Sequence, residues 1–181
     1  MNFKEFYLYE RVLYEPDNFK RNDNENYTFT VNDYNDNKPF EITFDIHTVD
    51  DDIYDFIPQL KDIKDINIKT GQNGNAVEWS FFESDNNSHL KYSTFSNRGA
   101  STALKVLNGV FYSIKDYINT SPNKIDYIFY EAEQDSENGI NKRERTYRTM
   151  FNMYSNSFKG WSGKPKFMDL DAYTLVINTN Q

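Results

Sequence analysis

Residues 95–158 read FSNRGASTALKVLNGVFYSIKDYINTSPNKIDYIFYEAEQDSENGINKRERTYRTMFNMYSNSF. Their pattern predicts a loop, an amphipathic helix, a buried strand, a second loop and a second helix. In the first helix, apolar residues recur at alternating steps of three and four: Leu104, Leu107, Phe111, Ile114 and Ile118. Such a stripe lies along one side of a helix and must pack against another element, which here is expected to be a sheet.

The strand predicted over residues 125–132 is apolar on both of its faces. Strands with apolar residues on both faces are typical of the centre of a sheet that is covered on both sides. The second helix carries its apolar residues at helical spacing: Tyr147, Met150, Phe151, Tyr154 and Phe158. Together these patterns place two helices against one central strand.

The other segments predict strands joined mainly by hairpins. Alternation over residues 27–34 and 39–47 indicates two half-buried strands, with a turn at 35–38 rich in Asn and Asp. A second hairpin is expected from 76–82 and 90–95, and a last strand at 172–178, after a loop at 159–167. Residues 50–75 are predicted to be mostly loop with one short element, and residues 3–13 fit either a helix, which we favour, or a strand.

These elements define an α+β fold with a mixed, mainly antiparallel sheet and two helices of the C-terminal half packed on it. Strands joined by a helix are expected to be parallel, with right-handed crossovers. The length of 181 residues fits a single domain. Within it, residues 1–95 would be mainly antiparallel strands, and residues 96–181 would form the helix-strand-helix-strand part.

Composition excludes several kinds of chemistry. The chain has no Cys, so thiol nucleophiles, disulfides and Cys-ligated metal clusters are excluded. Its two His residues, His47 and His89, fall on different predicted strands without a third ligand, and Asp50-Asp51-Asp52 is interpreted as a solvated turn. No leader or apolar span is visible, so we expect a protein without membrane contact. We also expect no metal or cofactor, and no catalytic residue can be assigned from the sequence. Glu131 and Glu133 faintly resemble the acidic pair that, with a Lys, holds Mg²⁺ in restriction-type nucleases. Here Lys142 follows a loop and is not on the same strand, which argues against such a site.

Charge is distributed unevenly along the chain. Residues 1–60 hold 14 acidic against 5 basic residues, and the whole chain has a net charge of −8, which argues against nucleic acid as a partner. A basic helix face is formed by Arg143, Arg145 and Arg148. Arg145 and Arg148 are expected to point outward. Glu144, four residues before Arg148, is the one carboxylate at helical spacing, so most of this basic surface should be free for a partner, which can be the acidic segment of a second copy in a homo-oligomer. Trp161, in a loop rich in Gly and Lys, is a further predicted interface residue.

Residues 97–101, Asn-Arg-Gly-Ala-Ser, lie between a predicted strand and the first helix. The arrangement over residues 90–177 resembles the second half of the GNAT acetyltransferase fold, in which a glycine-containing loop binds a pyrophosphate. The resemblance implies an acetyl-CoA site at Arg98, Gly99 and Ser101. The loop of that superfamily has a second small residue after the glycine, in the pattern Gly-x-Gly/Ala, and here only Gly99 matches. We therefore favour a structural interpretation, in which Gly99 permits a tight turn and Ser101 or Thr102 caps the helix.

A second resemblance rests on the Gly99-Ala100 turn, the long helix at 104–118, the short strand ending at Ala132 and the helix from Arg143 to Tyr154. This succession is similar to that of a group of uncharacterised tailed-bacteriophage proteins of similar length. It implies phage origin, a location in the host cytoplasm or the virion, and other phage or host proteins as partners. The favoured function is a non-catalytic one, through protein contacts, as a neck, tail or capsid-associated component or as an inhibitor of a host factor. A GNAT-like acyltransferase using acetyl-CoA is the alternative.

Overall fold

The computed structural model describes residues 13–84, 90–91, 99–131, 142–170 and 172–180. Its helices are α2 (Ile53–Phe56), α3 (Gly99–Thr120) and α4 (Lys142–Tyr154), with short 3-10 turns η1 (Pro58–Asp62), η2 (Gly71–Asn73) and η4 (Ser155–Ser157). Its strands are β1 (Asp17–Arg21), β2 (Asn26–Asn32), β3 (Pro39–Thr48), β4 (Ala76–Ser84), β5 (Leu90–Lys91), β6 (Tyr127–Glu131), β7 (Lys166–Leu170) and β8 (Tyr173–Ile177).

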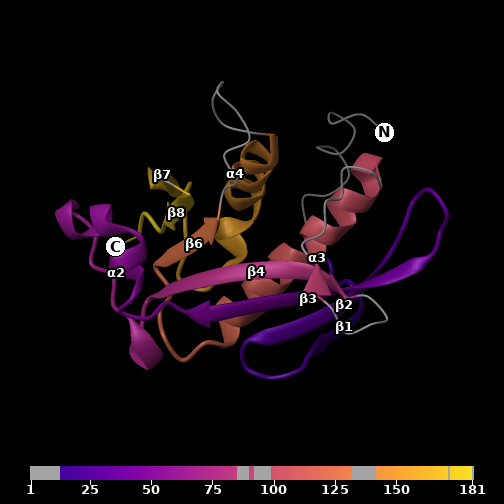
Figure 1. Cartoon of the computed structure of the whole chain (residues 1–181), viewed down its shortest axis with the longest axis horizontal. Helices are drawn as coiled ribbons and strands as arrows, with labels where there is room; N and C mark the ends of the chain where they lie inside the picture. The colour runs from indigo at the N-terminus through magenta and orange to yellow at the C-terminus, as the bar shows by residue number, and fades with distance from the viewer. Residues whose placement is uncertain (1–12, 85–89, 92–98, 132–141, 171, 181) are drawn as a thin grey trace. The chain divides into compact units, whose positions relative to one another are not determined.

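The strands are hydrogen-bonded in the order β1-β2-β3-β4-β6-β8-β7, and β5 pairs with β4 (Figure 1). The pair β4 and β6, which α3 connects, is parallel, whereas β1–β2, β2–β3, β4–β5, β6–β8 and β7–β8 are antiparallel. This confirms the predicted α+β class with a mixed, mainly antiparallel sheet. The last strand predicted from the sequence, which is β8, runs antiparallel to β6, because an additional strand, β7, follows α4 and the chain then reverses into β8.

The chain divides into two compact units, each built from two stretches of sequence. Unit 1 comprises residues 1–46 and 80–117, and unit 2 comprises residues 47–79 and 118–181. Both therefore combine residues from before and after position 95. The single-domain interpretation stays a prediction.

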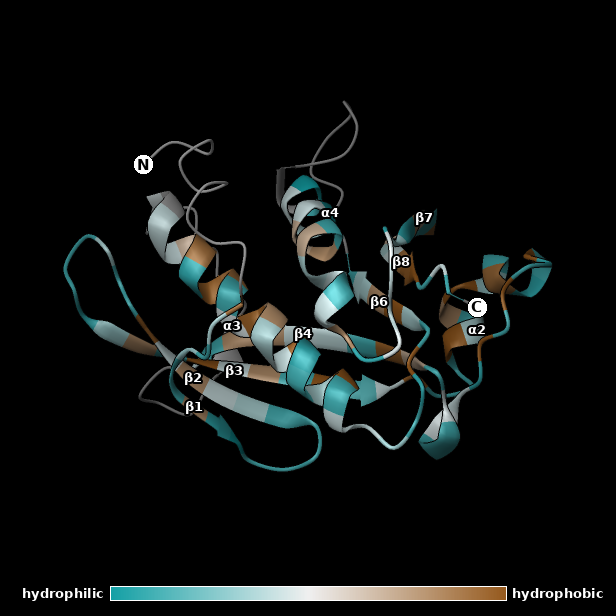
Figure 2. Cartoon of the chain, turned by 180° about the vertical axis from the view of Figure 1, so that it is seen from behind, coloured by the Kyte–Doolittle hydropathy of each residue, from teal (hydrophilic) through white to brown (hydrophobic). Residues whose placement is uncertain are grey.

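In unit 1, α3 packs on the hairpin of β2 and β3. These strands pair from Asn26↔Asp45 to Asn32↔Pro39, as the sequence predicted, and Asn37 in their turn has a φ of 54°. The stripe of α3 is buried at Leu107, Phe111 and Ile114 and half-buried at Leu104. Figure 2 shows the resulting alternation of hydrophobic and hydrophilic positions along α3.

The first turn of α3 is fixed to the hairpin of unit 1. The hydroxyl of Thr102, which is buried, accepts a hydrogen bond of 3.0 Å from the backbone N–H of Tyr34 and lies 3.5 Å from a carboxylate oxygen of Asp33. Thr102 therefore binds the hairpin turn, in addition to any capping role.

In unit 2, β6 is buried on both faces, as its sequence predicted. On one face Tyr130 contacts Tyr147 and Phe151 of α4, with ring centroids 5.3 and 5.9 Å apart. On the other face Tyr127 and Phe129 belong to a core cluster that includes Val49, Ile53, Ile57, Leu60, Ala76, Leu170 and Leu175. The segment of residues 49–60 thus covers one face of β6, and α4 covers the other.

Several segments differ from the sequence prediction. Strands β1 and β7 were not predicted, and β7 takes in residues assigned to the loop at 159–167. Alternation in β4 is confirmed for Val77 and Trp79, which are buried, but Phe81 is only half-buried. Residues 3–12, 92–98 and 132–141 lie outside the described residues, so the predictions for the N-terminal helix and most of the returning strand at 90–95 are not tested.

Gly109 offers a test of how closely α3 approaches β2. A methyl group at this position would overlap the side-chain ring of Phe29, which is fully buried. Although Ala favours a helix by roughly 1 kcal/mol over Gly, the overlap is expected to cost about 1–3 kcal/mol. Gly109→Ala should therefore lower the free energy of unfolding in urea, whereas Lys105→Ala, at an exposed position of the same helix, should not. A stabilised Gly109→Ala variant would contradict this packing.

Candidate functional site

The glycine turn before α3 is only partly described. Gly99 begins the helix with a φ of 82°, a left-handed value that favours glycine, and this agrees with its predicted structural role. Ser101 is half-buried in the first turn. Arg98 lies outside the described residues. The acetyl-CoA site at these residues therefore stays a prediction.

The basic face of α4 is more engaged within the chain than predicted. Arg145 is exposed, as expected. Arg148 donates a hydrogen bond of 2.7 Å from Nε to Oε1 of Glu144, forms an ion pair with Asp169 of β7, and lies over the ring of Phe167 at 5.2 Å. The sequence identified Glu144 as a neighbour of Arg148 but not Asp169, because β7 was not foreseen, and less of the basic surface is therefore free than predicted. The side chain of Arg143 is outside the described residues.

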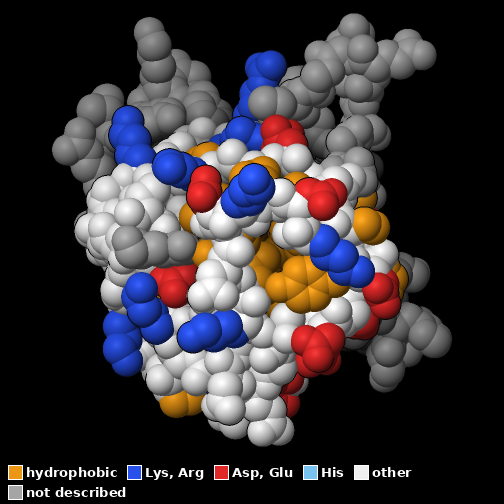
Figure 3. Space-filling model, turned by 90° about the vertical axis from the view of Figure 1, so that its left-hand side faces the viewer, with side chains coloured by type: hydrophobic (Ala, Val, Ile, Leu, Met, Phe, Trp, Pro, Cys, Tyr) orange, Lys and Arg blue, Asp and Glu red, His pale blue; other side chains and the backbone are white. Residues whose placement is uncertain are grey.

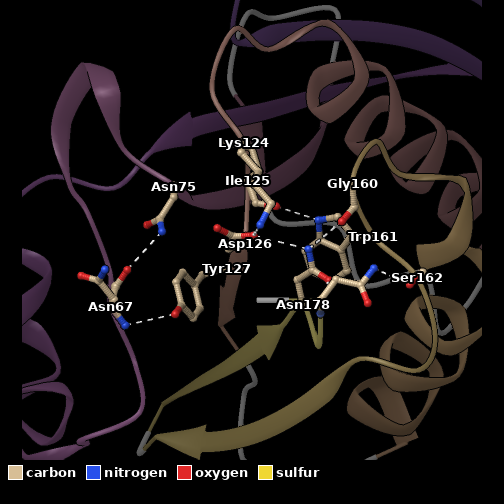
Figure 4. Close-up of polar contacts among 11 residues, drawn as sticks. Asn67, Asn75, Lys124, Ile125, Asp126, Tyr127, Gly160, Trp161, Ser162 and Asn178 are labelled. Atoms are coloured by element: carbon tan, nitrogen blue, oxygen red, sulfur yellow. Dashed lines mark hydrogen bonds and ion pairs between the residues drawn. The ribbon is translucent and has the colours of Figure 1, made fainter.

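Trp161 was predicted at an interface and is instead a buried anchor of unit 2. Its side chain is only 6% exposed, and its indole N–H donates a hydrogen bond of 2.7 Å to the backbone oxygen of Ile125 (Figure 4). The neighbouring Gly160 carbonyl accepts a hydrogen bond of 3.0 Å from the side chain of Asn178. These bonds fix the loop against the start of β6, so Trp161 does not present its ring to a partner.

A hollow of about 160 Å³ lies on the surface of unit 2, and sequence reasoning missed it. We call it the acidic hollow, and it is lined by His47, Val49, Asp50, Asp52, Ile53, Phe56, Glu78 and Tyr173. Three carboxylates and an imidazole therefore surround a space that also has an aromatic and aliphatic wall. Because pockets for small molecules usually enclose roughly 300–1,000 Å³, a volume of this size suits one side chain better than a cofactor.

The turn into α2 places the acidic side chains. Asp51 accepts a hydrogen bond from the hydroxyl of Thr70, which leaves its neighbours Asp50 and Asp52 to line the hollow. Asp52 precedes α2 but its side chain makes no capping hydrogen bond, so its carboxylate is not consumed by the helix. The loop thus directs two carboxylates to one place.

Phe56, the last residue of α2, is the apolar part of this surface. Its side chain is 69% exposed, although large apolar rings usually lie inside. Figure 3 shows hydrophobic side chains exposed among charged ones on the side of the molecule where α2 lies in Figure 1. The only sequence signal for this position was a large apolar residue at the end of a stretch rich in Asp, residues 50–56, which reads DDDIYDF.

Glu78 of β4 forms the polar floor of the acidic hollow. Burial raises the pKa of its carboxyl group, and the charges of Glu131 and Asp52 raise it further, whereas His47 lowers it. The ionised form of Glu78 is therefore poorly compensated within the chain. A cation in the hollow would stabilise that form.

No protein-family model, curated protein or solved structure matches the chain. Among the described residues, no group of three or more His, Asp or Glu side chains is arranged to hold a metal ion. The helices in that part of the chain are also too short or too polar to cross a membrane. What the chain does must therefore be argued from the surfaces described above.

The two arginines of α4 form a matched pair for a stability test. Arg148→Ala should lower the free energy of unfolding by roughly 1–3 kcal/mol, because it removes the charge-assisted hydrogen bond from Arg148 to the buried Glu144 carboxylate. Arg145→Ala, on the exposed side of the same helix, should change it by less than about 0.5 kcal/mol. Equal effects of the two substitutions in urea unfolding would show that the Arg148 contacts do not stabilise the fold.

Glu78 should make stability depend on pH. Because its pKa is raised above the ordinary value of 4.5, the folded chain holds a proton that the unfolded chain has already lost, and stability falls as pH rises above that value. Glu78→Gln removes this loss, so the variant should gain thermal stability over the natural chain at about pH 7 and gain less at about pH 4. Scanning calorimetry of both proteins at the two pH values checks it. A gain that does not depend on pH would refute the assignment.

Proposed function

We propose that this is a bacteriophage-encoded, non-catalytic protein that acts through contacts with other proteins. The observation that carries the proposal is Phe56, an aromatic side chain 69% exposed beside the acidic hollow of unit 2. Aromatic residues that stand out from a surface next to a small recess are typical of the few residues that supply most of the binding energy in protein interfaces. The contact surface therefore differs from the one predicted at Trp161.

Phage origin rests on the resemblance of the chain to tailed-bacteriophage proteins. The succession that carries it agrees with the described elements: a turn at Gly99, the long helix α3, the short strand β6 and the helix α4. In this proposal the partner is another phage protein, in the neck, tail or capsid, or a host factor that the protein inhibits. The protein would be found in the host cytoplasm or in the virion accordingly.

A GNAT-like acyltransferase remains the second candidate. It is favoured by one observation, the glycine with positive φ that begins α3 between the parallel strands β4 and β6. The contact function is preferred because the loop keeps only Gly99 of the Gly-x-Gly/Ala pattern, whereas unit 2 exposes the ring of Phe56 beside the acidic hollow.

The contact function predicts that Phe56 is needed for partner capture. The tagged protein, produced during phage infection, should retain a defined phage or host protein that Phe56→Ala retains at least about 30-fold more weakly, the effect of losing a central interface residue. Tyr34→Ala is the matched control, because Tyr34 is a 72% exposed aromatic side chain of unit 1. Binding constants should be measured with the purified partner. Mass spectrometry of purified particles then separates a virion component from a host-directed inhibitor.

Two results would count against this function. If Phe56→Ala captures the partner as strongly as Tyr34→Ala does, Phe56 is not part of the contact surface, and the proposal loses its support. Micromolar binding of acetyl-CoA in isothermal titration, lost in Arg98→Ala, would favour the acyltransferase instead.

A further inference from the structure

The acidic hollow has the features of a receptor for a single positively charged side chain. Its described lining includes Asp50, Asp52 and Glu78, and none of its lining residues is Lys or Arg. The carboxylates come from two places, the turn before α2 and strand β4. Their combined negative charge favours a cation in the hollow.

The hollow also offers an apolar surface to the same ligand. Phe56 and Tyr173 supply aromatic rings, and Val49 and Ile53 supply aliphatic carbon. A guanidinium group is planar, is weakly hydrated, stacks on aromatic faces and forms paired hydrogen bonds with a carboxylate. Hydrated metal ions gain nothing from a phenyl ring. The mixture of rings and carboxylates therefore selects an arginine over a metal ion.

We propose that the acidic hollow binds an arginine side chain of a partner protein, with the guanidinium group between the carboxylates of Glu78 and Asp52 and against the ring of Phe56. This inference rests on the proposed contact function and names the chemistry of its partner. The size of the hollow, about 160 Å³, agrees with one side chain. The raised pKa of Glu78 also agrees with a cationic ligand, since a bound cation would compensate its buried charge.

A small-molecule probe can test the hollow without knowledge of the partner. Titration of the intact protein with N-ethylguanidinium, followed by amide NMR shifts, should give weak saturable binding that perturbs residues 47–56, 78 and 173. N-ethylurea, which has nearly the same shape and no charge, should bind at least about tenfold more weakly, because a charge-assisted hydrogen bond is roughly twice as strong as a neutral one. High salt should weaken the guanidinium binding.

Variants locate the binding. Glu78→Gln and Phe56→Ala should each weaken N-ethylguanidinium about tenfold, whereas Asp62→Asn, an exposed carboxylate of η1 outside the hollow, should leave it unchanged. If Glu78→Gln fails to fold, Asp52→Asn replaces it, with an expected loss of about threefold because Asp52 is exposed.

Three outcomes would overturn the proposal: no saturable shifts, equal binding of N-ethylurea, or tighter binding of magnesium chloride at the same amides, which would show a metal site.

The two proposals fail separately. If partner capture needs Phe56 but N-ethylguanidinium does not bind, the contact function stands and the arginine site falls. If the probe binds but Phe56 does not affect capture, the hollow is a cation site and the contact function at this surface falls.

Discussion

Burial of β6 on both faces is the constraint on which unit 2 depends. Tyr130 faces α4, whereas Tyr127 and Phe129 face the cluster formed with the segment of residues 49–60. Both edges of the strand are also occupied, by β4 in parallel and by β8 in antiparallel pairing. When a strand is paired on both edges and its side chains are packed on both faces, a change of register would displace buried side chains, so its neighbours have little freedom to shift.

The segment just before β6 forms polar contacts with side chains of unit 2, two of them from distant parts of the sequence. The oxygen of Ile125 accepts from Trp161, and the carboxylate of Asp126 pairs with Lys124 at 2.8 Å and lies 3.4 Å from the side-chain nitrogen of Asn178. Within the polar, glycine-containing loop at 159–163, Trp161 is for this reason buried, whereas the residues on either side of it are exposed. Charge and an exposed ring occur together instead at the turn and short helix of residues 50–56.

The elements that sequence reasoning missed are strands with weak hydrophobic patterns. β1, with the sequence DNFKR, and β7, with KFMDL, each pair with one neighbour, β2 and β8. Edge strands need no continuous apolar face and often carry charges, so alternation does not identify them. The missed strand also affected the predicted basic interface on α4, because β7 carries Asp169, the residue that binds Arg148.

By itself, the sequence determined the elements whose apolar residues repeat with a regular period, namely the hairpin of β2 and β3 and the helices α3 and α4. It also determined β6, a short run that is apolar on both faces. Period is a local property, and it decides which side of an element must leave water. The tertiary structure alone decided what each polar side chain meets. Arg148 binds Asp169, which lies 21 residues away in the chain, Trp161 is buried, and Asp52 and Glu78 share one hollow. Such pairs depend on how distant segments are brought together, and nothing in the local spacing of residues encodes that distance.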